Sequence, residues 1–171
     1  NPIDQDGTYP LPEAQMDRFL FKTVLTYPSV DEEKQLIKRY QGGFPDIKKP
    51  VLPINQIPVI QSVANQIYID DRVSEYVVRI INATRHPEEY GLNDIKPYIR
   101  CGASPRATLA CISSAKAYAC LQKRNYVIPE DIKYLGYDIL RHRLNLSFAA
   151  EAESVSADKI IETILGNIEV P

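Results

Sequence analysis

The pattern of apolar positions changes along this chain. Residues 19–27, FLFKTVLTY, are aromatic and β-branched and are bounded by Pro28, which predicts a strand. From residue 58 onward the apolar positions recur every three or four residues, which is the period of a helix. Within 71–85 these positions are Val73, Val77, Ile80, Ile81 and Thr84. The helices predicted in this part of the chain cover residues 58–67, 71–85, 104–124, 129–144 and 156–168.

Polar motifs mark two further helices before residue 44. Pro12 suits the first position of a short helix over 12–18. Ser29 and Glu32 have the spacing of a capping box, and Gly42–Gly43 ends the helix that this box starts. Three acids, DEE at 31–33, therefore lie in the first turn of a helix, where they suit the helix dipole.

The remaining segments are connectors or short elements. Residues 44–58 contain four prolines and no helical period, so they indicate a semi-extended connector and the best domain boundary. Residues 86–103 are expected to form a loop, and NLSF at 145–148 a short strand or a turn. Ser104 and Ser156 are the expected N-caps of the helices that follow them. A lone strand at 19–27 cannot satisfy its own backbone groups, so its sheet partners must come from elsewhere.

Composition narrows the class of protein. The 171 residues are 44% hydrophobic and 25% charged, with a net charge of −2, which is typical of a globular domain. A slightly acidic chain does not suggest a nonspecific nucleic-acid surface, and no apolar run approaches the roughly 20 residues that span a bilayer. No secretory leader is visible, and a cytoplasmic location is expected.

Most of the reactive side chains look structural. Cys111 and Cys120 point to nearly opposite faces of their helix, so one metal site cannot use both, and with Cys101 they are expected to be small apolar residues within helices. His86 and His142 are isolated, which favours surface or capping roles. The sequence therefore predicts no metal site.

Two arginines stand apart from these residues. Arg18 lies directly before the predicted strand, and Arg106 is the second residue of the helix that Ser104 caps. An arginine in the first turn of a helix works against the dipole unless an anion binds there. The planar guanidinium suits phosphate oxygens, so both arginines are candidates for anion binding.

Two long motifs resemble one known family. NPIDQDGTYPLPEAQMDRF at the start of the chain resembles the signature of the MoxR family of AAA+ ATPases. GASPRATLACISSAKAYACLQKRNYVIPEDI, followed by LRHRLNLSFAAEAESVSADKII, resembles the C-terminal lid of that family. The resemblance runs from Asn1 to about Ile161 and is weakest over 41–70.

The resemblance implies a role for three residues. Asn1 matches sensor 1, which orients the attacking water beside the γ-phosphate. Arg18 matches the arginine finger, which reaches into the nucleotide site of the neighbouring subunit and stabilises charge on the transferred phosphoryl group. Arg106 matches the sensor 2 arginine, which contacts nucleotide phosphate from the lid.

The resemblance also implies the fold and the domains. A mainly α protein is expected, in which a small helical-bundle lid at 59–171 follows the connector 44–58. Residues 1–43 would be the end of the α/β P-loop ATPase core, with a short helix, the last strand and a helix. The strand at 19–27 would then have lost its sheet, so pairing between chains or disorder near the N-terminus is expected.

The family implies an ATPase whose other parts are not in this chain. No G-x-x-x-x-G-K-[ST] motif is present, and Walker A and Walker B are missing, so the chain alone is expected to be inactive and to hold neither ATP nor Mg²⁺ tightly. The intact protein would use both, assemble as a ring, expected to be a hexamer, and remodel or mature client proteins, in some cases with a von Willebrand factor A domain partner.

Two alternatives belong to other classes. The chain could be a free-standing, non-catalytic helical interaction module derived from an AAA+ lid. A helical DNA-binding domain fits less well, because the last helices carry mixed charge and the whole chain is slightly acidic.

Overall fold

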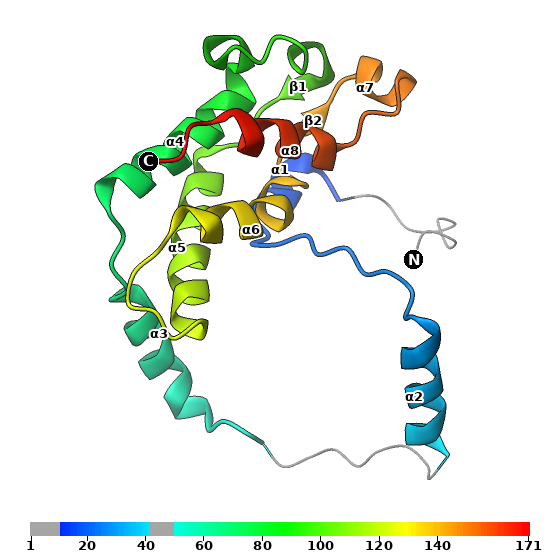
Figure 1. The fold of residues 1–171 in the computed structure, drawn as a ribbon, viewed down its shortest axis with the longest axis vertical. Helices are drawn as coiled ribbons and strands as arrows, with labels where there is room; N and C mark the ends of the chain where they lie inside the picture. Colours follow the sequence, from blue (N-terminus) through cyan, green and yellow to red (C-terminus); the bar gives the residue numbers. More distant parts are fainter. Residues whose placement is uncertain (1–10, 42–49) are drawn as a thin grey trace.

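The computed structural model describes residues 11–41 and 50–171, and most of this part of the chain is helical (Figure 1). Its α-helices are α1 (Glu13–Met16), α2 (Val30–Tyr40), α3 (Ile57–Asn65), α4 (Asp71–Arg85), α5 (Pro105–Leu121), α6 (Pro129–Leu140), α7 (Phe148–Ala152) and α8 (Ala157–Asn167). Shorter elements are the 3-10 helices η1 (Ile54–Gln56), η2 (Pro87–Tyr90) and η3 (Lys96–Tyr98) and the strands β1 (Ile99–Cys101) and β2 (Asn145–Leu146).

The core lies between α4, α5, α6 and α8. Large side chains of α4, α6 and α8 fill it, among them Tyr76, Ile80, Ile139 and Ile161. The buried residues of α5 are all small and recur every three or four positions: Ala107, Ala110, Cys111, Ser114, Ala115 and Ala119. Small side chains allow neighbouring helices to approach closely, so α5 runs through the middle of the bundle and its N-terminal end is firmly held.

The predicted helices are largely confirmed. Helix α4 has the bounds expected from its apolar period, and Ser104 and Ser156 cap α5 and α8. Helix α2 begins with the expected capping box of Ser29 and Glu32, although Gly42–Gly43 lies outside the described residues. Helix α7 is absent from the prediction, because five residues are too few to show a helical period.

A small antiparallel ribbon connects the segment before α5 with the segment after α6. Strand β1 pairs with β2 in the register Ile99 to Leu146, and Cys101 pairs with Asn145. NLSF therefore begins with a strand, one of the two forms that were expected. The prediction of a plain loop over 86–103 is wrong, since that segment contains η2, η3 and β1.

The predicted strand at 19–27 is also wrong. The described structure has no strand there, and the only sheet in residues 11–41 and 50–171 is the β1–β2 ribbon. A strand needs a neighbour to take up its backbone groups, and none lies beside this segment. Side chains at the end of α6 bind several of its backbone groups instead. The expectation that it pairs with another chain stays a prediction.

Helix α2 stands apart from the bundle in Figure 1. None of its residues is buried, and Leu36 and Ile37 are 56% and 59% exposed. The division into 1–43, 44–58 and 59–171 stays a prediction. Within the described residues, no helix has the length and apolar character required to cross a membrane.

Candidate functional site

Asp17 lies at the N-terminal end of α5, where the first backbone N–H groups have no helical partner. Its two carboxylate oxygens lie 3.0 and 2.9 Å from the Ser104 hydroxyl, which donates to them. Nη1 of Arg106 donates to Oδ2 at 3.1 Å, and Nε of Arg143 lies 3.3 Å from Oδ1. One carboxylate from the start of the chain is therefore held by three residues of the helical bundle.

The surroundings of Asp17 keep it ionised. Burial raises the pKa of its carboxyl, but hydrogen bonds from Ser104 and Arg106 and the charges of Arg143 and Arg106 outweigh this effect. The net result is a pKa below the ordinary value. Asp17 is thus a permanent counter-ion for the arginines around it at neutral pH.

Arg106 occupies the position at which the sequence predicts an anion. It is the second residue of α5, and its side chain is 60% exposed. The anion that the structure supplies there is Asp17. Only Nη1 of the guanidinium binds Asp17 within the described part of the chain, so the other N–H groups remain able to bind a second anion.

Arg18 lies beside this ion pair. It follows the single turn of α1, and its backbone N–H donates to the carbonyl of Gln15 at 3.1 Å. Its side chain is exposed and forms no hydrogen bond or ion pair within residues 11–41 and 50–171. The guanidinium is therefore free to meet a group outside the described structure.

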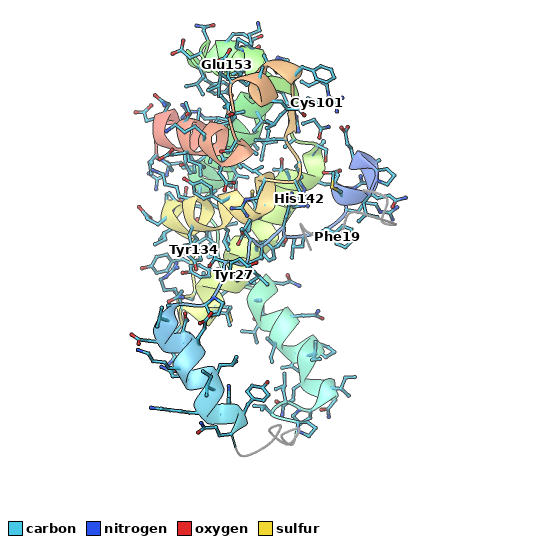
Figure 2. All side chains as sticks on the ribbon, turned by 90° about the vertical axis from the view of Figure 1, so that its right-hand side faces the viewer. Phe19, Tyr27, Cys101, Tyr134, His142 and Glu153 are labelled. Atoms are coloured by element: carbon cyan, nitrogen blue, oxygen red, sulfur yellow. The ribbon has the colours of Figure 1, made fainter. Side chains whose placement is uncertain are left out.

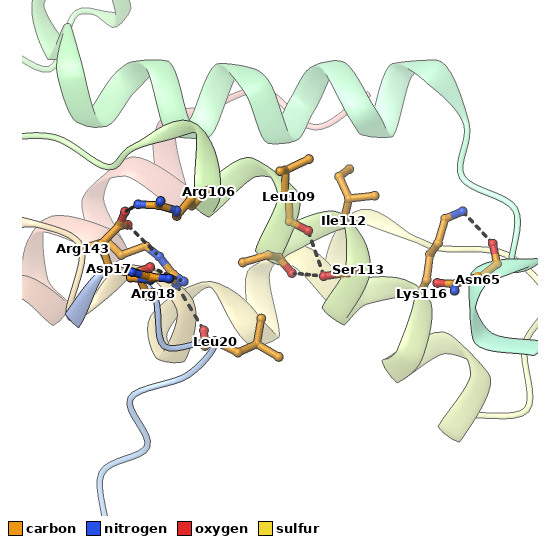
Figure 3. A pocket seen from close by; sticks show the side chains of 11 residues that line it. Asp17, Arg18, Leu20, Asn65, Arg106, Leu109, Ile112, Ser113, Lys116 and Arg143 are labelled. Atoms are coloured by element: carbon orange, nitrogen blue, oxygen red, sulfur yellow. Dashed lines mark hydrogen bonds and ion pairs between the residues drawn. The ribbon is translucent and has the colours of Figure 1, made fainter. Parts of the chain in front are cut away.

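Arg18 and Arg106 line the same cleft, although they lie far apart in the sequence (Figure 3). The cleft has a volume of about 520 Å³, and Lys116, Arg143 and Asp17 also line it. Nζ of Lys116 donates to the carbonyl of Asn65 at 3.1 Å. Four cationic side chains and one carboxylate give the cleft a positive balance, which suits a phosphate or another multivalent anion.

Three consecutive residues after α6 bind the backbone of residues 17–22. Nη1 of Arg141 donates to the carbonyl of Lys22 at 2.7 Å, and the backbone N–H of Lys22 donates to the carbonyl of Asp138 at 2.8 Å. Nε2 of His142 donates to the carbonyl of Phe19 at 2.9 Å, and both residues are labelled at this junction in Figure 2. Arg143 binds further carbonyls of the same segment.

His142 corrects a prediction made from the sequence. A surface or capping role was expected, but the side chain is 7% exposed and lies between α6 and residues 17–22. Nδ1 is buried and has no hydrogen-bond partner among residues 11–41 and 50–171, so the ring is neutral with its proton on Nε2. Burial lowers the pKa of His142, and this effect outweighs the hydrogen bond to the Phe19 carbonyl, which raises it.

The remaining candidate residues from the sequence are Asn1, His86 and the cysteines. Asn1 lies outside the described residues. His86 forms the C-cap of α4, as a capping role predicts. Cys111 is buried, and burial raises the pKa of its thiol to about 12, which agrees with the expected apolar role. Cys101 is exposed on β1 rather than packed in a helix. No group of three or more His, Cys, Asp or Glu side chains in the described part of the chain could hold a metal ion.

Comparisons with known proteins agree with this arrangement. Residues 93–164 match a family model described as the AAA lid domain, and residues 1–21 match one described as the ATPase family associated with various cellular activities. The chain superimposes with a TM-score of 0.94 and 41% identity on a crystallised protein from Cytophaga hutchinsonii that is named as an ATPase. All of this chain and 52% of that protein are covered. The helical bundle is an AAA+ lid.

Sequence relatives give the family. The chain is 42% identical over its full length to the chaperone MoxR1 of Mycobacterium tuberculosis, covering 45% of that protein. It is 38% identical to YeaC of Bacillus subtilis, covering 51%, and 27% identical to MoxR of Paracoccus denitrificans, covering 54%. The chain belongs to the MoxR family of AAA+ ATPases. It spans about half the length of the relatives it matches.

Proposed function

We propose that the intact protein hydrolyses ATP and that Arg18 and Arg106 both contact nucleotide phosphate. The observation that carries this proposal is their presence on one cleft, each with guanidinium N–H groups that the described chain leaves unused. Arg106 binds phosphate from the lid, as sensor 2. Arg18 acts as an arginine finger on the nucleotide of a neighbouring subunit, and Asn1 acts as sensor 1 on the attacking water.

These arginines act by electrostatic stabilisation of the transition state. Negative charge that develops on the transferred phosphoryl group is stabilised by fixed cations that need no reorganisation during the reaction. A phosphate in the cleft competes with Asp17 for Arg106, because both anions use the same guanidinium. The described residues contain no group of three or more His, Cys, Asp or Glu side chains that could hold a metal ion.

The biological role follows the relatives. The mycobacterial relative is named a chaperone, and we propose that this protein likewise uses ATP hydrolysis to remodel or mature client proteins in the cytoplasm. A hexameric ring supplies the neighbour on which Arg18 acts, and a protein with a von Willebrand factor A domain is a candidate partner. Exposed apolar residues of α2 and α3, such as Leu36 and Ile60, leave surface for the rest of such a ring.

The test uses ATP hydrolysis by the intact protein. Arg18→Ala and Arg106→Ala are each expected to lower kcat by roughly tenfold or more, since one charged transition-state contact is worth several kcal/mol. Arg72→Ala is the matched control, because Arg72 is an exposed arginine whose only ion-pair partner among the described residues is Asp70. Mixing Arg18→Ala subunits with subunits inactivated in their own P-loop should restore activity if the finger acts in trans.

Normal hydrolysis by Arg18→Ala would show that the finger assignment is wrong. If neither arginine variant changes kcat, the non-catalytic interaction module becomes the better reading of this chain. The same assay on the 171-residue chain alone tests the expectation that it is inactive without Walker A and Walker B.

A further inference from the structure

Arg143 contacts three successive parts of the start of the chain, at Asp17, Phe19 and Leu20. Nη2 donates to the carbonyl of Asp17 at 3.2 Å and to that of Phe19 at 2.5 Å. Nη1 donates to the carbonyl of Leu20 at 3.1 Å and to that of Ile139, at the end of α6, at 2.5 Å. Its side chain is only 3% exposed, and Nε faces the Asp17 carboxylate at 3.3 Å.

Two of these carbonyls flank Arg18. They belong to the residues immediately before and after it, and one nitrogen of Arg143 binds both. The side chain of Arg18 itself has no partner within the described residues, so its direction depends on the backbone that carries it. That backbone lies in no strand, and past the single turn of α1 it lies in no helix either. The contacts from the lid are therefore the main restraint on this backbone.

Arg143 is poorly placed to bind a phosphate itself. It lines the cleft, but its two terminal nitrogens are occupied by four backbone carbonyls and its Nε lies beside Asp17. A buried guanidinium whose donors are already used cannot leave them without uncovering unpaired carbonyls. Arg18 and Arg106, by contrast, are exposed.

We propose that Arg143, supported by His142, is a positioning residue for Arg18: it fixes the peptide groups on both sides of the finger to the end of α6. The orientation of the finger is then set by the lid, so that a lid movement carries Arg18 with it. This inference rests on the proposed function, because it requires Arg18 to act on a phosphate.

The test is a double-mutant cycle on ATP hydrolysis by the intact protein. Arg143→Lys keeps the positive charge beside Asp17 but cannot span the carbonyls with one ammonium group. We expect kcat to fall by roughly tenfold or more, because small misplacements of a catalytic group have effects of this size. The KM for ATP should stay within about threefold, since Arg143 does not touch the nucleotide.

The decisive variant combines Arg143→Lys with Arg18→Ala. If Arg143 acts through Arg18, the double variant hydrolyses ATP within about twofold of Arg18→Ala alone, because the finger it positions is already gone. Arg124→Lys is the matched control. Arg124 is a mostly buried lid arginine, 22% exposed, that pairs with Asp131 and does not contact residues 17–22. Arg124→Lys should lower thermal stability and leave kcat within about twofold of the wild-type value.

His142→Leu provides a second variant in case Arg143→Lys does not fold. It removes the other donor to the Phe19 carbonyl and should lower kcat by a smaller factor, again only when Arg18 is present. If the double variant loses kcat by the product of the two single losses, Arg143 does not act through Arg18 and the positioning role is overturned. A loss of kcat in Arg124→Lys as large as that in Arg143→Lys would overturn it too. Normal activity of Arg143→Lys beside a slow Arg18→Ala overturns this inference alone, whereas normal activity of Arg18→Ala overturns the proposed function with it.

Discussion

Asp17 and Arg106 form an ion pair that joins the start of the chain to the lid, with Oδ2 and Nη1 separated by 3.1 Å. The pair places a carboxylate where the sequence predicts an external anion, at the first turn of α5. It also places Arg18, the next residue after Asp17, on the same cleft as Arg106. The geometry of both candidate phosphate-binding arginines therefore depends on one acidic side chain.

Asp17→Asn tests the energetic value of this acid. The variant keeps a group of the same shape beside Ser104 but leaves the buried Arg143 without its counter-ion. We expect the free energy of unfolding of the chain to fall by about 1–3 kcal/mol at pH 7, the usual cost of an unsatisfied polar or charged contact. Urea unfolding monitored by circular dichroism measures this difference.

The difference should also depend on pH in a defined direction. The pKa of Asp17 is lower in the folded chain than its ordinary value, so the folded state binds fewer protons in acid than the unfolded state. The stabilisation is complete above the unfolded pKa, roughly 4, and is lost as the pH falls through the folded pKa. If the difference in the free energy of unfolding between wild type and Asp17→Asn stays constant down to pH 3, Asp17 does not have the lowered pKa.

Ser104 has two roles that a matched cap can separate. Its hydroxyl accepts the backbone N–H of Arg106 at 3.2 Å as the N-cap of α5, and it donates to Asp17. Ser156 caps α8 by accepting the N–H of Lys159 at 3.2 Å, and its hydroxyl has no acidic partner in the part of the chain that the structure describes. Ser156→Ala is expected to cost about 1 kcal/mol, and Ser104→Ala clearly more, because it also removes a donor from a carboxylate.

Thermal or urea unfolding of the two alanine variants compares these costs directly. Limited proteolysis gives a second readout, since Ser104→Ala should increase cleavage after Arg18 while Ser156→Ala should not. Equal costs and equal cleavage would show that the Ser104–Asp17 contact adds nothing to the cap.

How far the sequence predicts this structure depends on the range over which each signal acts. The caps at Ser29, Ser104 and Ser156 and the period within 71–85 are local patterns, and the structure confirms them. The strand at 19–27 fails because β-branched and aromatic residues predict a strand only where a neighbouring strand exists. That neighbour is a property of the tertiary fold and cannot be read from nine residues.

The site shows the same division. Arg18 and Arg106 are predicted as anion-binding residues from their positions, but their common cleft depends on Asp17 and Arg143, which no local pattern singles out. The three residues RHR at 141–143 offer a partial sequence signal for this contact. Three consecutive polar residues at the end of a helix have several hydrogen-bond donors that require acceptors. Their acceptors in residues 17–22 lie more than 100 residues away, at backbone carbonyls that every sequence possesses.

His142 predicts a second pH effect in a different range. Burial lowers its pKa in the folded chain; the charges of Arg143 and Lys22 act in the same direction, while the Phe19 carbonyl and Asp17 oppose it. The unfolded chain therefore binds more protons below about pH 6.5, and stability falls as the pH drops from 7 to 5. His142→Gln keeps a donor for the Phe19 carbonyl and has no proton to gain.

The free energy of unfolding of wild type relative to His142→Gln should therefore decrease with falling pH, by at most about 1.4 kcal/mol per pH unit. Urea unfolding at several pH values between 5 and 8 measures the slope. Equal slopes for wild type and His142→Gln would contradict a buried neutral His142.

Gly102 predicts how tightly the start of α5 is held against α4. A Cβ atom at this position would lie 2.4 Å from the carbonyl oxygen of Thr84, which is backbone and cannot rotate away. The hydroxyl of Thr84 accepts the N–H of Ala103 at 2.9 Å, so the two segments are joined at the next residue as well. Gly102→Ala should separate them, lower the free energy of unfolding by about 1–3 kcal/mol, and shift Ser104 and Arg106 with respect to Asp17.

Gly166→Ala is the matched control, since a Cβ there meets nothing within 4 Å and alanine favours a helix. Unfolding of both variants distinguishes the cases: destabilisation at 102 with no loss at 166 supports the close approach, whereas a neutral Gly102→Ala would mean that the GAS motif is not needed to place Arg106.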